Sequence, residues 1–511
     1  MAKFPTVRTP TIEEVLDIAE GYGMTITVED AESFRGLMAG TIASYHRLDD
    51  LDEPKLPVKY PRSPGYRPPP EENPYNAWYW KSEVKGKSSG PLKGKRVALK
   101  DNICLAGVPM MNGATVLEGY VPDVDATVVT RILDAGGTII GKAANTYLCF
   151  DGGSATTATG MVDNPHKPGY TCGGSSAGSG VLVLTGEADM ALGGDQGGSI
   201  RMPACWSGIY GHKPTHGLVP YTGIFPIEQT LDHTGPMARS VSDVAALLQV
   251  IAGPDGQDPR QIGTKTQRYT SAVDKGAEGM KIGVVKEGFG HPESEDAVDS
   301  CVRATVQRFA ELGATVDEIS IPMHLDGPHI WNGIAVEGAT ALMLKGNGFG
   351  TNWEGYYVTS LIDAYARGWR SRPDDLSETV KMVMMLGEFM HKNYHGRYYA
   401  KAQNLSRRLR ETYDASLAEY DVLAMPTLPM LATKLPEPDC SREEYVDAAL
   451  NMLANTSPFD ATGHPAMTVP CGKADDSPIG LMLIGKRYDD ATVIQAAGAF
   501  ESLGVYTVST V

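Results

Sequence analysis

Short apolar runs recur along the chain and predict buried β-strands. They lie at residues 95–99, 138–140, 281–285, 315–319 and 479–484. Longer stretches with helical periodicity separate most of these runs, so that the two kinds of element alternate. Strands that alternate with helices of this length need crossover connections, which are typical of a parallel or mixed sheet.

The stretches between the runs carry start and stop signals for helices. Asp125 is placed to cap a helix that ends before a glycine pair, and further helices are expected over 294–312 and 490–503. Gly313 is the expected stop of the helix over 294–312. We therefore expect an α/β fold in which helices cover a mixed, mostly parallel central sheet.

The first part of the chain follows a different pattern and predicts an N-terminal helical extension. Thr11 and Glu14 form a capping box before an apolar stripe, and a second helix is expected over about 29–51. Eight prolines then crowd residues 54–74, which can continue neither a helix nor a sheet. We expect an extended connector there and place the boundary near residue 75, so that residues 1–75 form a helical segment with a proline-rich connector.

Residues 76–511 are predicted to form the main domain. Within it, residues 336–420 break the alternation, because they are mostly helical, aromatic and charged and contain no convincing strand. Such an excursion from a sheet often lines a substrate pocket. We therefore expect residues 336–420 to be a helical excursion, or a small domain beside the pocket.

Composition excludes several classes of protein. The 511 residues carry a net charge of −17, which makes nucleic acid a poor candidate as a main partner. No stretch approaches 18 uninterrupted apolar residues, and the start of the chain lacks the apolar region of a signal peptide. The seven cysteines are scattered, with no C-x-x-C pair, as expected of reduced buried thiols rather than a disulfide framework or a zinc site. We expect a soluble, cytoplasmic protein with no membrane partner.

Three segments are candidates for chemistry, although each taken singly has an ordinary alternative. Lys100 follows an apolar strand and would alone be interpreted as a lysine that extends to solvent. The segment 172–180 is rich in glycine and serine, as a flexible linker would be. In the segment 193–201, Ser199 follows two glycines, an arrangement that lets backbone N–H groups converge as in an oxyanion hole but also makes plain turns.

Residues 174–178 also fit G-x-S-x-G, the nucleophile elbow of α/β-hydrolases, with Ser176 as the nucleophile. That motif requires a hydrophobic strand directly before it. Residues 161–172 instead contain two prolines, two aspartate or asparagine residues and two basic side chains. The elbow is therefore the weaker interpretation of this segment.

Taken together, the three segments resemble the amidase signature family. The motifs that carry the resemblance are Val97-Ala98-Leu99-Lys100-Asp101-Asn102, Gly173-Gly174-Ser175-Ser176 and Asp195-Gln196-Gly197-Gly198-Ser199-Ile200-Arg201. Lys100 and Ser175 are 75 positions apart, and Ser175 and Ser199 are 24 positions apart, as is typical of that family. The resemblance covers about residues 75–511, and the N-terminal helices with their proline-rich lead are most similar to nitrile-hydratase-associated, enantioselective amidases.

The resemblance implies a Ser–Ser–Lys triad and the amidase signature fold. Ser199 would be the nucleophile, Ser175 the bridging serine after a cis peptide bond, and Lys100 the base. The N–H groups of Gln196, Gly197 and Gly198 would complete the oxyanion hole. As substrate-binding residues we expect Phe150, Gly174 and Trp331, with a place in the core as the alternative for Trp331.

The resemblance also implies a cytoplasmic homodimer that needs no metal and no organic cofactor. Its substrate would be a small aliphatic or aromatic amide, which it would cleave to a carboxylic acid and ammonia or an amine through an acyl-enzyme. Cleavage of carbamates, anilides or esters is the alternative, and an amide-binding relative without activity is a further one. One departure concerns Phe150-Asp151-Gly152-Gly153, which stands where many members have a glycine followed by serines.

The triad sets a physical requirement for Lys100. A serine hydroxyl is a weak nucleophile unless a base removes its proton. Lysine can act as that base only when it is neutral, and its reference pKa of about 10.4 leaves roughly one lysine in a thousand neutral near pH 7.4. We therefore expect Lys100 to be buried, because burial lowers the pKa of a lysine.

Overall fold

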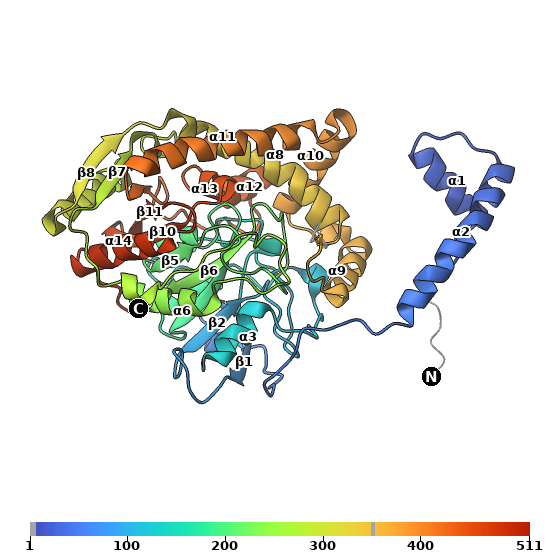
Figure 1. Ribbon diagram of the computed structural model, residues 1–511, viewed down its shortest axis with the longest axis horizontal. Helices are drawn as coiled ribbons and strands as arrows, with labels where there is room; N and C mark the ends of the chain where they lie inside the picture. The colour runs from blue at the N-terminus through green and yellow to red at the C-terminus, as the bar shows by residue number, and fades with distance from the viewer. Residues whose placement is uncertain (1–6, 349–352, 511) are drawn as a thin grey trace. The chain divides into compact units, whose positions relative to one another are not determined.

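A computed structural model of the chain describes residues 7–348 and 353–510 (Figure 1). The chain divides into two compact units, Met1–Leu56 and Pro57–Val511. The division between the units thus lies before most of the proline-rich connector. The sequence pattern instead places the boundary near residue 75, after the connector. None of the described helices combines the length and the apolar character that crossing a membrane requires.

The first unit contains two helices, α1 (Ile12–Gly21) and α2 (Val28–Asp49). The predicted capping box is confirmed, because the Thr11 side chain accepts from the Glu14 N–H while the Glu14 carboxylate accepts from the Thr11 N–H. Little of this unit is buried within itself. Large apolar side chains of both helices are exposed, among them Ile18, Tyr22, Phe34, Leu37 and Leu48.

The connector after residue 56 packs on the second unit. The Tyr60 hydroxyl donates to Asp134 at 2.6 Å, and the Arg62 guanidinium pairs with Asp125. Asp125 also accepts from the Ala106 N–H at 3.0 Å. The prediction that Asp125 caps the next helix is therefore wrong: that helix has Ala126 at its N-cap position without a side-chain cap, because the Asp125 carboxylate is used for the connector instead.

One sheet of eleven strands forms the centre of the second unit, in the order β1-β3-β2-β4-β6-β5-β10-β11-β9-β7-β8. The strands are β1 (Trp78–Lys85), β2 (Arg96–Lys100), β3 (Thr138–Ala143), β4 (Met190–Asp195), β5 (Tyr210–Lys213), β6 (His233–Ala238), β7 (Lys281–Val285), β8 (Thr315–Ile319), β9 (Val422–Pro426), β10 (Ala466–Ala474) and β11 (Ser477–Ile484).

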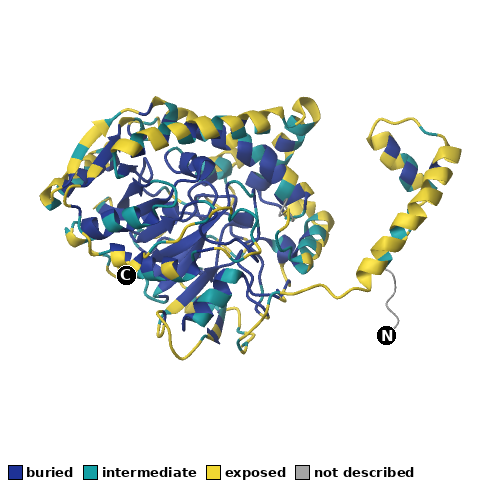
Figure 2. Ribbon diagram, in the orientation of Figure 1, coloured by how far each residue is buried: buried dark blue, intermediate teal, exposed yellow. Residues whose placement is uncertain are grey.

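The sheet is mixed, as predicted. Its parallel pairs lie in two groups, β3-β2-β4 and β9-β7-β8, where helices connect the strands by crossovers. Antiparallel pairs join these two groups through β6, β5, β10 and β11. Figure 2 shows the central strands in the colour of buried residues, whereas the edge strand β8 and the outer faces of the covering helices are largely exposed or intermediate.

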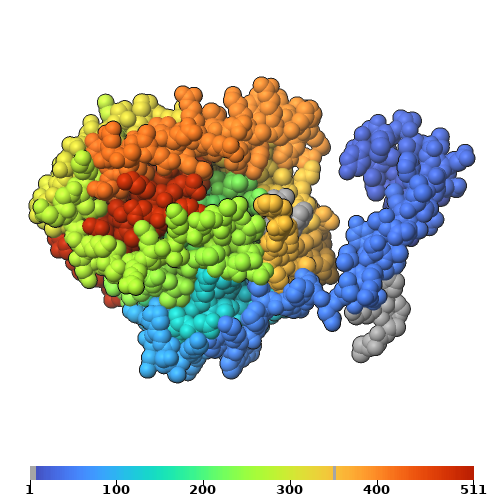
Figure 3. All heavy atoms as spheres, in the orientation of Figure 1, coloured from blue at the N-terminus to red at the C-terminus, as the bar shows by residue number. Residues whose placement is uncertain are grey.

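Helices cover the sheet, and the described chain between β8 and β9 is mainly helical. The helices of the second unit are α3 (Thr127–Asp134), α4 (Ala177–Leu184), α5 (Arg201–Trp206), α6 (Val241–Ile251), α7 (Asp296–Val306), α8 (Gly327–Ala339), α9 (Thr359–Ser371), α10 (Glu378–Tyr394), α11 (Arg397–Glu419), α12 (Arg442–Leu450), α13 (Ser457–Thr462) and α14 (Asp490–Ser502). The orange surface around residue 400 adjoins the red C-terminal surface in Figure 3, and Arg410 of α11 donates to the Thr462 carbonyl of α13 at 2.9 Å.

Candidate active site

The carboxyl ends of the parallel strands β2 and β4 lie side by side and carry the candidate catalytic residues. Lys100 is the last residue of β2 and is fully buried. Its Nζ lies 2.6 Å from Ser175 Oγ and 3.1 Å from the Gly194 carbonyl oxygen of β4. Ends of parallel strands are where α/β folds position binding and catalytic groups, and here that edge brings Lys100 into contact with Ser175.

The loop that carries Ser175 depends on its two glycines. The Gly174–Ser175 peptide bond is cis. Gly173 has a φ of +82°, and a Cβ there would lie 2.8 Å from the backbone of Pro203. A Cβ on Gly174 would lie 2.7 Å from the Asp151 carbonyl oxygen. Only glycine fits at both positions, so that the loop can place Ser175 Oγ against Lys100.

Burial sets the protonation of Lys100. Removal from water lowers the pKa of Lys100, while Cys149, Asp195 and Asp232 act in the opposite direction and only partly offset that effect. A lowered pKa increases the neutral fraction of the amine near pH 7. The pKa of Lys100 is therefore shifted in the direction that a lysine base requires.

The segment 195–201 is built around one buried carboxylate. Asp195 accepts from the N–H groups of Gly198 at 2.6 Å and Ile200 at 3.0 Å. It also pairs with the buried guanidinium of Arg201, whose Nη2 lies 2.9 Å from Asp195 Oδ1 and 2.6 Å from Asp460 Oδ2. Although burial alone would raise the pKa of Asp195, the Arg201 charge keeps it well below its ordinary value. Asp195 is thus an ionised acceptor that fixes the turn on which Ser199 sits.

Ser199 lies between this turn and a cavity. The residue is 6 % exposed, and its backbone carbonyl accepts from the Ser176 N–H at 3.3 Å. That contact joins the turn to the loop that carries Ser175. The structure thus brings the loops of Ser175 and Ser199 together beside Lys100.

The cavity beside Ser199 has an empty volume of about 430 Å³ and a mostly apolar wall. Its lining residues are Cys149, Phe150, Asp151, Gly152, Gln196, Gly197, Ser199, Met202, Ile227, Leu231, Trp331, Ala335, Leu450 and Leu453. The predicted residues Phe150 and Trp331 are therefore in this wall. Gly174 is not among the lining residues, because it is packed behind the wall against Asp151.

A larger cavity adjoins the first. It has an empty volume of about 1230 Å³ and shares five lining residues with the smaller cavity, namely Phe150, Trp331, Ala335, Leu450 and Leu453. Helix α8 contributes to both walls through Trp331 and Ala335. The shared wall makes the larger cavity a continuation of the space in front of Ser199.

The predicted oxyanion-hole residues differ in how their N–H groups are used. The Gly198 N–H already donates to the Asp195 carboxylate. Among the described residues, none is hydrogen-bonded to the Gly197 N–H as an acceptor. The Gln196 side chain donates to the Tyr221 hydroxyl at 2.8 Å.

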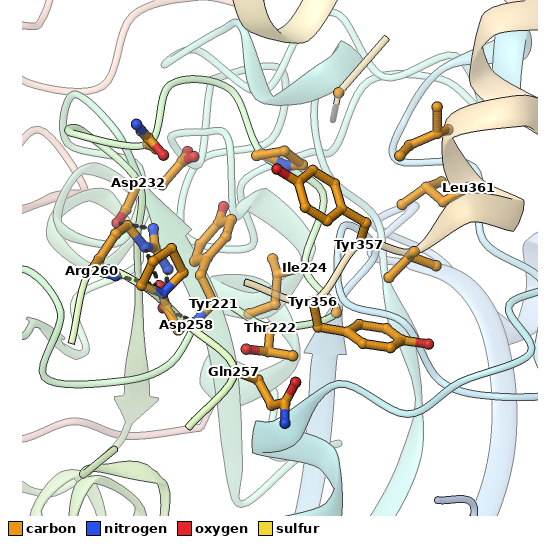
Figure 4. A pocket seen from close by; sticks show the side chains of 17 residues that line it. Tyr221, Thr222, Ile224, Asp232, Gln257, Asp258, Arg260, Tyr356, Tyr357 and Leu361 are labelled. Atoms are coloured by element: carbon orange, nitrogen blue, oxygen red, sulfur yellow. Dashed lines mark hydrogen bonds and ion pairs between the residues drawn. The ribbon is translucent and has the colours of Figure 1, made fainter. Parts of the chain in front are cut away.

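Tyr221 in turn lines a separate pocket with an empty volume of about 550 Å³ (Figure 4). Figure 4 shows Asp232, Arg260 and Asp258 together at one side of this pocket. Arg260 donates to Asp258 at 2.8 Å through Nε, and its guanidinium lies over the Tyr221 ring. Burial raises the pKa of Asp232 to about 7. This pocket shares no lining residue with the cavity in front of Ser199.

Three residues at the site are not predicted from the sequence: Cys149, Asp460 and Thr456. Cys149 lines the cavity and donates through Sγ to Asn112 Oδ1 at 3.3 Å, and burial raises the pKa of its thiol. Its one sequence signal is its place directly before Phe150. Asp460 and Thr456 contact the Ser199 turn from more than 250 positions away, and a pattern of neighbouring residues carries no signal for such contacts.

Ser176 is the nucleophile in the alternative interpretation, the nucleophile elbow. Its Oγ donates to the Gly194 carbonyl and accepts from the Gly194 N–H, both at 3.1 Å, and it does not line the cavity. We expect Ser176→Ala to lower kcat by less than roughly 10-fold and to lower the free energy of unfolding by about 1–2 kcal/mol, the cost of leaving buried backbone groups without their partner. Steady-state kinetics and urea unfolding measure the two effects. A complete loss of turnover with an intact fold would support the nucleophile elbow instead.

The chain is similar to known amidases along most of its length. Residues 70–494 match the model of the family described as Amidase. The chain is 46 % identical to an enantioselective amidase of Rhodococcus rhodochrous, with 94 % of each chain covered. It is 36 % identical to one component of the glutamyl-tRNA(Gln) amidotransferase of Haloarcula marismortui, over 83 % of this chain and 99 % of the relative. Among solved structures, the peptide amidase of Stenotrophomonas maltophilia is similar with a TM-score of 0.68 and 28 % identity, covering 82 % of this chain and 85 % of that one.

Proposed function

The chain belongs to the amidase signature family and is an amidase, and on that basis we propose that it hydrolyses small aliphatic and aromatic amides to a carboxylic acid and ammonia or an amine. The proposed catalytic group is a triad of Ser199, Ser175 and Lys100. The observation that carries this proposal is the 2.6 Å contact between the buried Lys100 Nζ and Ser175 Oγ, at the loop that also contacts Ser199.

In the proposed first step, Ser199 Oγ attacks the carbonyl carbon of the substrate. Its proton passes to Ser175 Oγ while the Ser175 proton passes to neutral Lys100, because a hydroxyl is both donor and acceptor. The carbonyl oxygen becomes an oxyanion. A donor that is directed at that oxygen before the reaction stabilises it without reorganisation.

In the proposed second step, the tetrahedral intermediate collapses and the C–N bond breaks. The leaving nitrogen takes the proton back from Lys100 through Ser175, which leaves an ester on Ser199. Water then attacks this ester and gives its proton through Ser175 to Lys100. The second tetrahedral intermediate collapses, the bond between Ser199 Oγ and the acyl carbon breaks, and Ser199 Oγ takes that proton back. The carboxylic acid leaves, and Lys100 is neutral again for the next cycle.

For the oxyanion we propose the N–H groups of Gln196 and Gly197. The sequence-based proposal also includes Gly198, but the Gly198 N–H already serves Asp195. Ser199 and these donors belong to one turn that a buried carboxylate fixes. A turn of this kind supports the pre-organised geometry that catalysis at a carbonyl needs.

The cavity favours uncharged acyl groups. Its described lining residues include no lysine and no arginine, so that the α-carboxylate of glutamine would find no cationic partner there. The one carboxylate in the wall, Asp151, accepts N–H bonds from Ala155 and Thr156, each at 3.0 Å. We therefore place a glutamine-using role below the hydrolysis of apolar amides. Carbamates, anilides and esters remain the alternative substrates.

The test is a panel of aliphatic amides, benzamide, anilides, carbamates and esters with the purified full chain. We expect turnover of the apolar amides, and we expect mass spectrometry of a rapidly quenched reaction to place the acyl group on Ser199. An acyl group on another side chain would refute the triad. Absence of turnover across the panel would favour the amide-binding relative without activity.

A homodimer in the cytoplasm stays a prediction. It is supported by the exposed apolar side chains of α1 and α2, since exposed patches of that kind often mark association sites. Light scattering on the eluate of a sizing column is expected to give twice the mass of the 54.7 kDa chain. A mass of one chain at micromolar concentration would refute the dimer.

A further inference from the structure

The peptide group between Gln196 and Gly197 is held from outside its own turn. The indole N–H of Trp331, on helix α8, donates to the Gln196 carbonyl oxygen at 2.6 Å. The Trp331 side chain is almost fully buried, and it also forms part of the cavity wall. A residue that the sequence suggests only as a substrate contact therefore has a second contact, to the backbone directly before the proposed nucleophile.

That contact fixes the direction of another group. The carbonyl and the N–H of a trans peptide point in opposite directions in one plane. The peptide bond between Gln196 and Gly197 is trans, since the cis bond of the described residues is Gly174–Ser175. When Trp331 holds the Gln196 carbonyl, the Gly197 N–H must therefore point to the opposite side. Donation to a peptide carbonyl also polarises the peptide and makes its N–H a stronger donor.

We propose that Trp331 is a positioning residue of the oxyanion hole: its indole N–H holds the Gln196 carbonyl and so directs the Gly197 N–H at the developing oxyanion. This inference rests on the proposed function, because it takes Ser199 as the nucleophile. It adds a role for Trp331 that does not depend on contact with the substrate.

The neighbouring peptide supports the same arrangement. The Gly197 carbonyl accepts from Thr456 Oγ1 at 2.6 Å, and the N–H of the same peptide, on Gly198, donates to Asp195. The peptides 196–197 and 197–198 are thus both fixed by side chains from outside the peptides themselves. Of their two N–H groups, the one at Gly197 is hydrogen-bonded to no acceptor among the described residues. It is the group that an oxyanion would complete.

Close packing leaves this peptide little freedom to turn. A Cβ on Gly197 would lie 2.8 Å from Trp331 Cζ2, so that the indole ring lies directly against the glycine. The ring blocks one side of the peptide, and the hydrogen bond fixes its plane. If the indole N–H of Trp331 were removed, the plane of the peptide 196–197 could rotate about the bonds that flank it.

The first test is Trp331→Phe, which keeps an aromatic ring and removes the N–H. Complete loss of one oxyanion donor costs about 10²–10³-fold in kcat, and a donor that is only misdirected costs less. We expect kcat to fall about 10- to 100-fold. The matched control is Trp80→Phe in β1, which removes the 2.7 Å bond from an indole N–H to the Pro64 carbonyl and is expected to leave kcat unchanged.

A second variant separates the hydrogen bond from the shape of the ring. Benzothienylalanine at position 331 keeps the bicyclic ring and lacks the N–H, so that the cavity wall is preserved. We expect it to lower kcat as Trp331→Phe does, with KM within about threefold of the wild type. An aldehyde analogue of the substrate, which becomes tetrahedral on Ser199, is expected to bind more weakly by the same factor as kcat/KM. An unreactive ketone analogue that stays trigonal is expected to bind as before.

Two outcomes would overturn this inference while leaving the proposed function intact. One is an unchanged kcat in the benzothienylalanine variant, when Ser199→Ala abolishes turnover. The other is an equal loss of affinity for the aldehyde and the trigonal analogue, which would make Trp331 a wall residue only. Turnover that survives Ser199→Ala would instead refute the proposed function itself.

Discussion

Ser199→Ala is expected to lower the turnover of benzamide by at least roughly 10⁴-fold. A nucleophile and its base act together, so that removal of the nucleophile alone abolishes nearly all of the rate enhancement that the two provide. The substitution removes one oxygen at the cavity wall, from a residue that is 6 % exposed. It leaves no new void in the core. The fold and the affinity for an unreactive amide analogue should therefore stay unchanged. Initial rates, thermal unfolding and analogue titration measure these three properties.

The Ser199 experiment has a matched control in the same site. Ser176→Ala removes the same oxygen atom from a buried serine nearby, and its expected loss is small. A loss of similar size in both variants would indicate a structural effect of serine removal. Residual turnover of a tenth or more in Ser199→Ala would remove Ser199 from its proposed role.

Lys100→Met is expected to lower kcat/KM at pH 7 by about 10²–10⁴-fold, the usual contribution of a positioned base. Methionine fills a similar space but cannot accept the proton from Ser175. The variant should regain part of its activity at high pH, where hydroxide replaces the base. In the wild type, kcat/KM should rise with pH through the lowered pKa of Lys100, because only the neutral amine accepts a proton. A wild-type profile that is flat below pH 9 would contradict a lysine base.

The same substitution should make the protein more stable near neutral pH. Lys100 has a lower pKa in the folded chain than in the unfolded chain, so the unfolded state binds the proton more readily. Below the ordinary pKa of lysine, this difference favours unfolding. Lys100→Met removes it, and the gain should fade as the pH rises toward that ordinary value. Urea unfolding at pH 7 and at pH 10 measures the difference, and a variant that is less stable at pH 7 would contradict the assigned cause.

Local patterns predicted several elements of the fold. The runs at 281–285 and 315–319 are strands with the predicted bounds, and Gly313 ends its helix in the left-handed conformation. The resemblance to the amidase signature family, carried by three segments at fixed spacing, singled out Lys100, Ser175 and Ser199 as a set. Glycines are part of that resemblance, because the backbone of the Ser175 loop tolerates no side chain at Gly173 or Gly174. Such positions leave a direct trace in the sequence.

Contacts across the fold left no such trace. Asp125 has the sequence context of a helix cap, yet the Arg62 guanidinium from the connector takes its carboxylate. Trp331 was predicted as a pocket residue, but its bond to the Gln196 carbonyl depends on how α8 packs against a turn 135 positions away. The order of the strands decides which of these groups meet, and hydrophobic periodicity does not encode that order.

The contacts of Thr456 and Asp460 with the Ser199 turn have a consequence for biosynthesis. Both residues, and the strand β10 that enters the middle of the sheet, come late in the chain. A ribosome must therefore synthesise the chain beyond β10 before the Ser199 turn can form these contacts. Nascent chains that stop before Thr456 are expected to be catalytically inert.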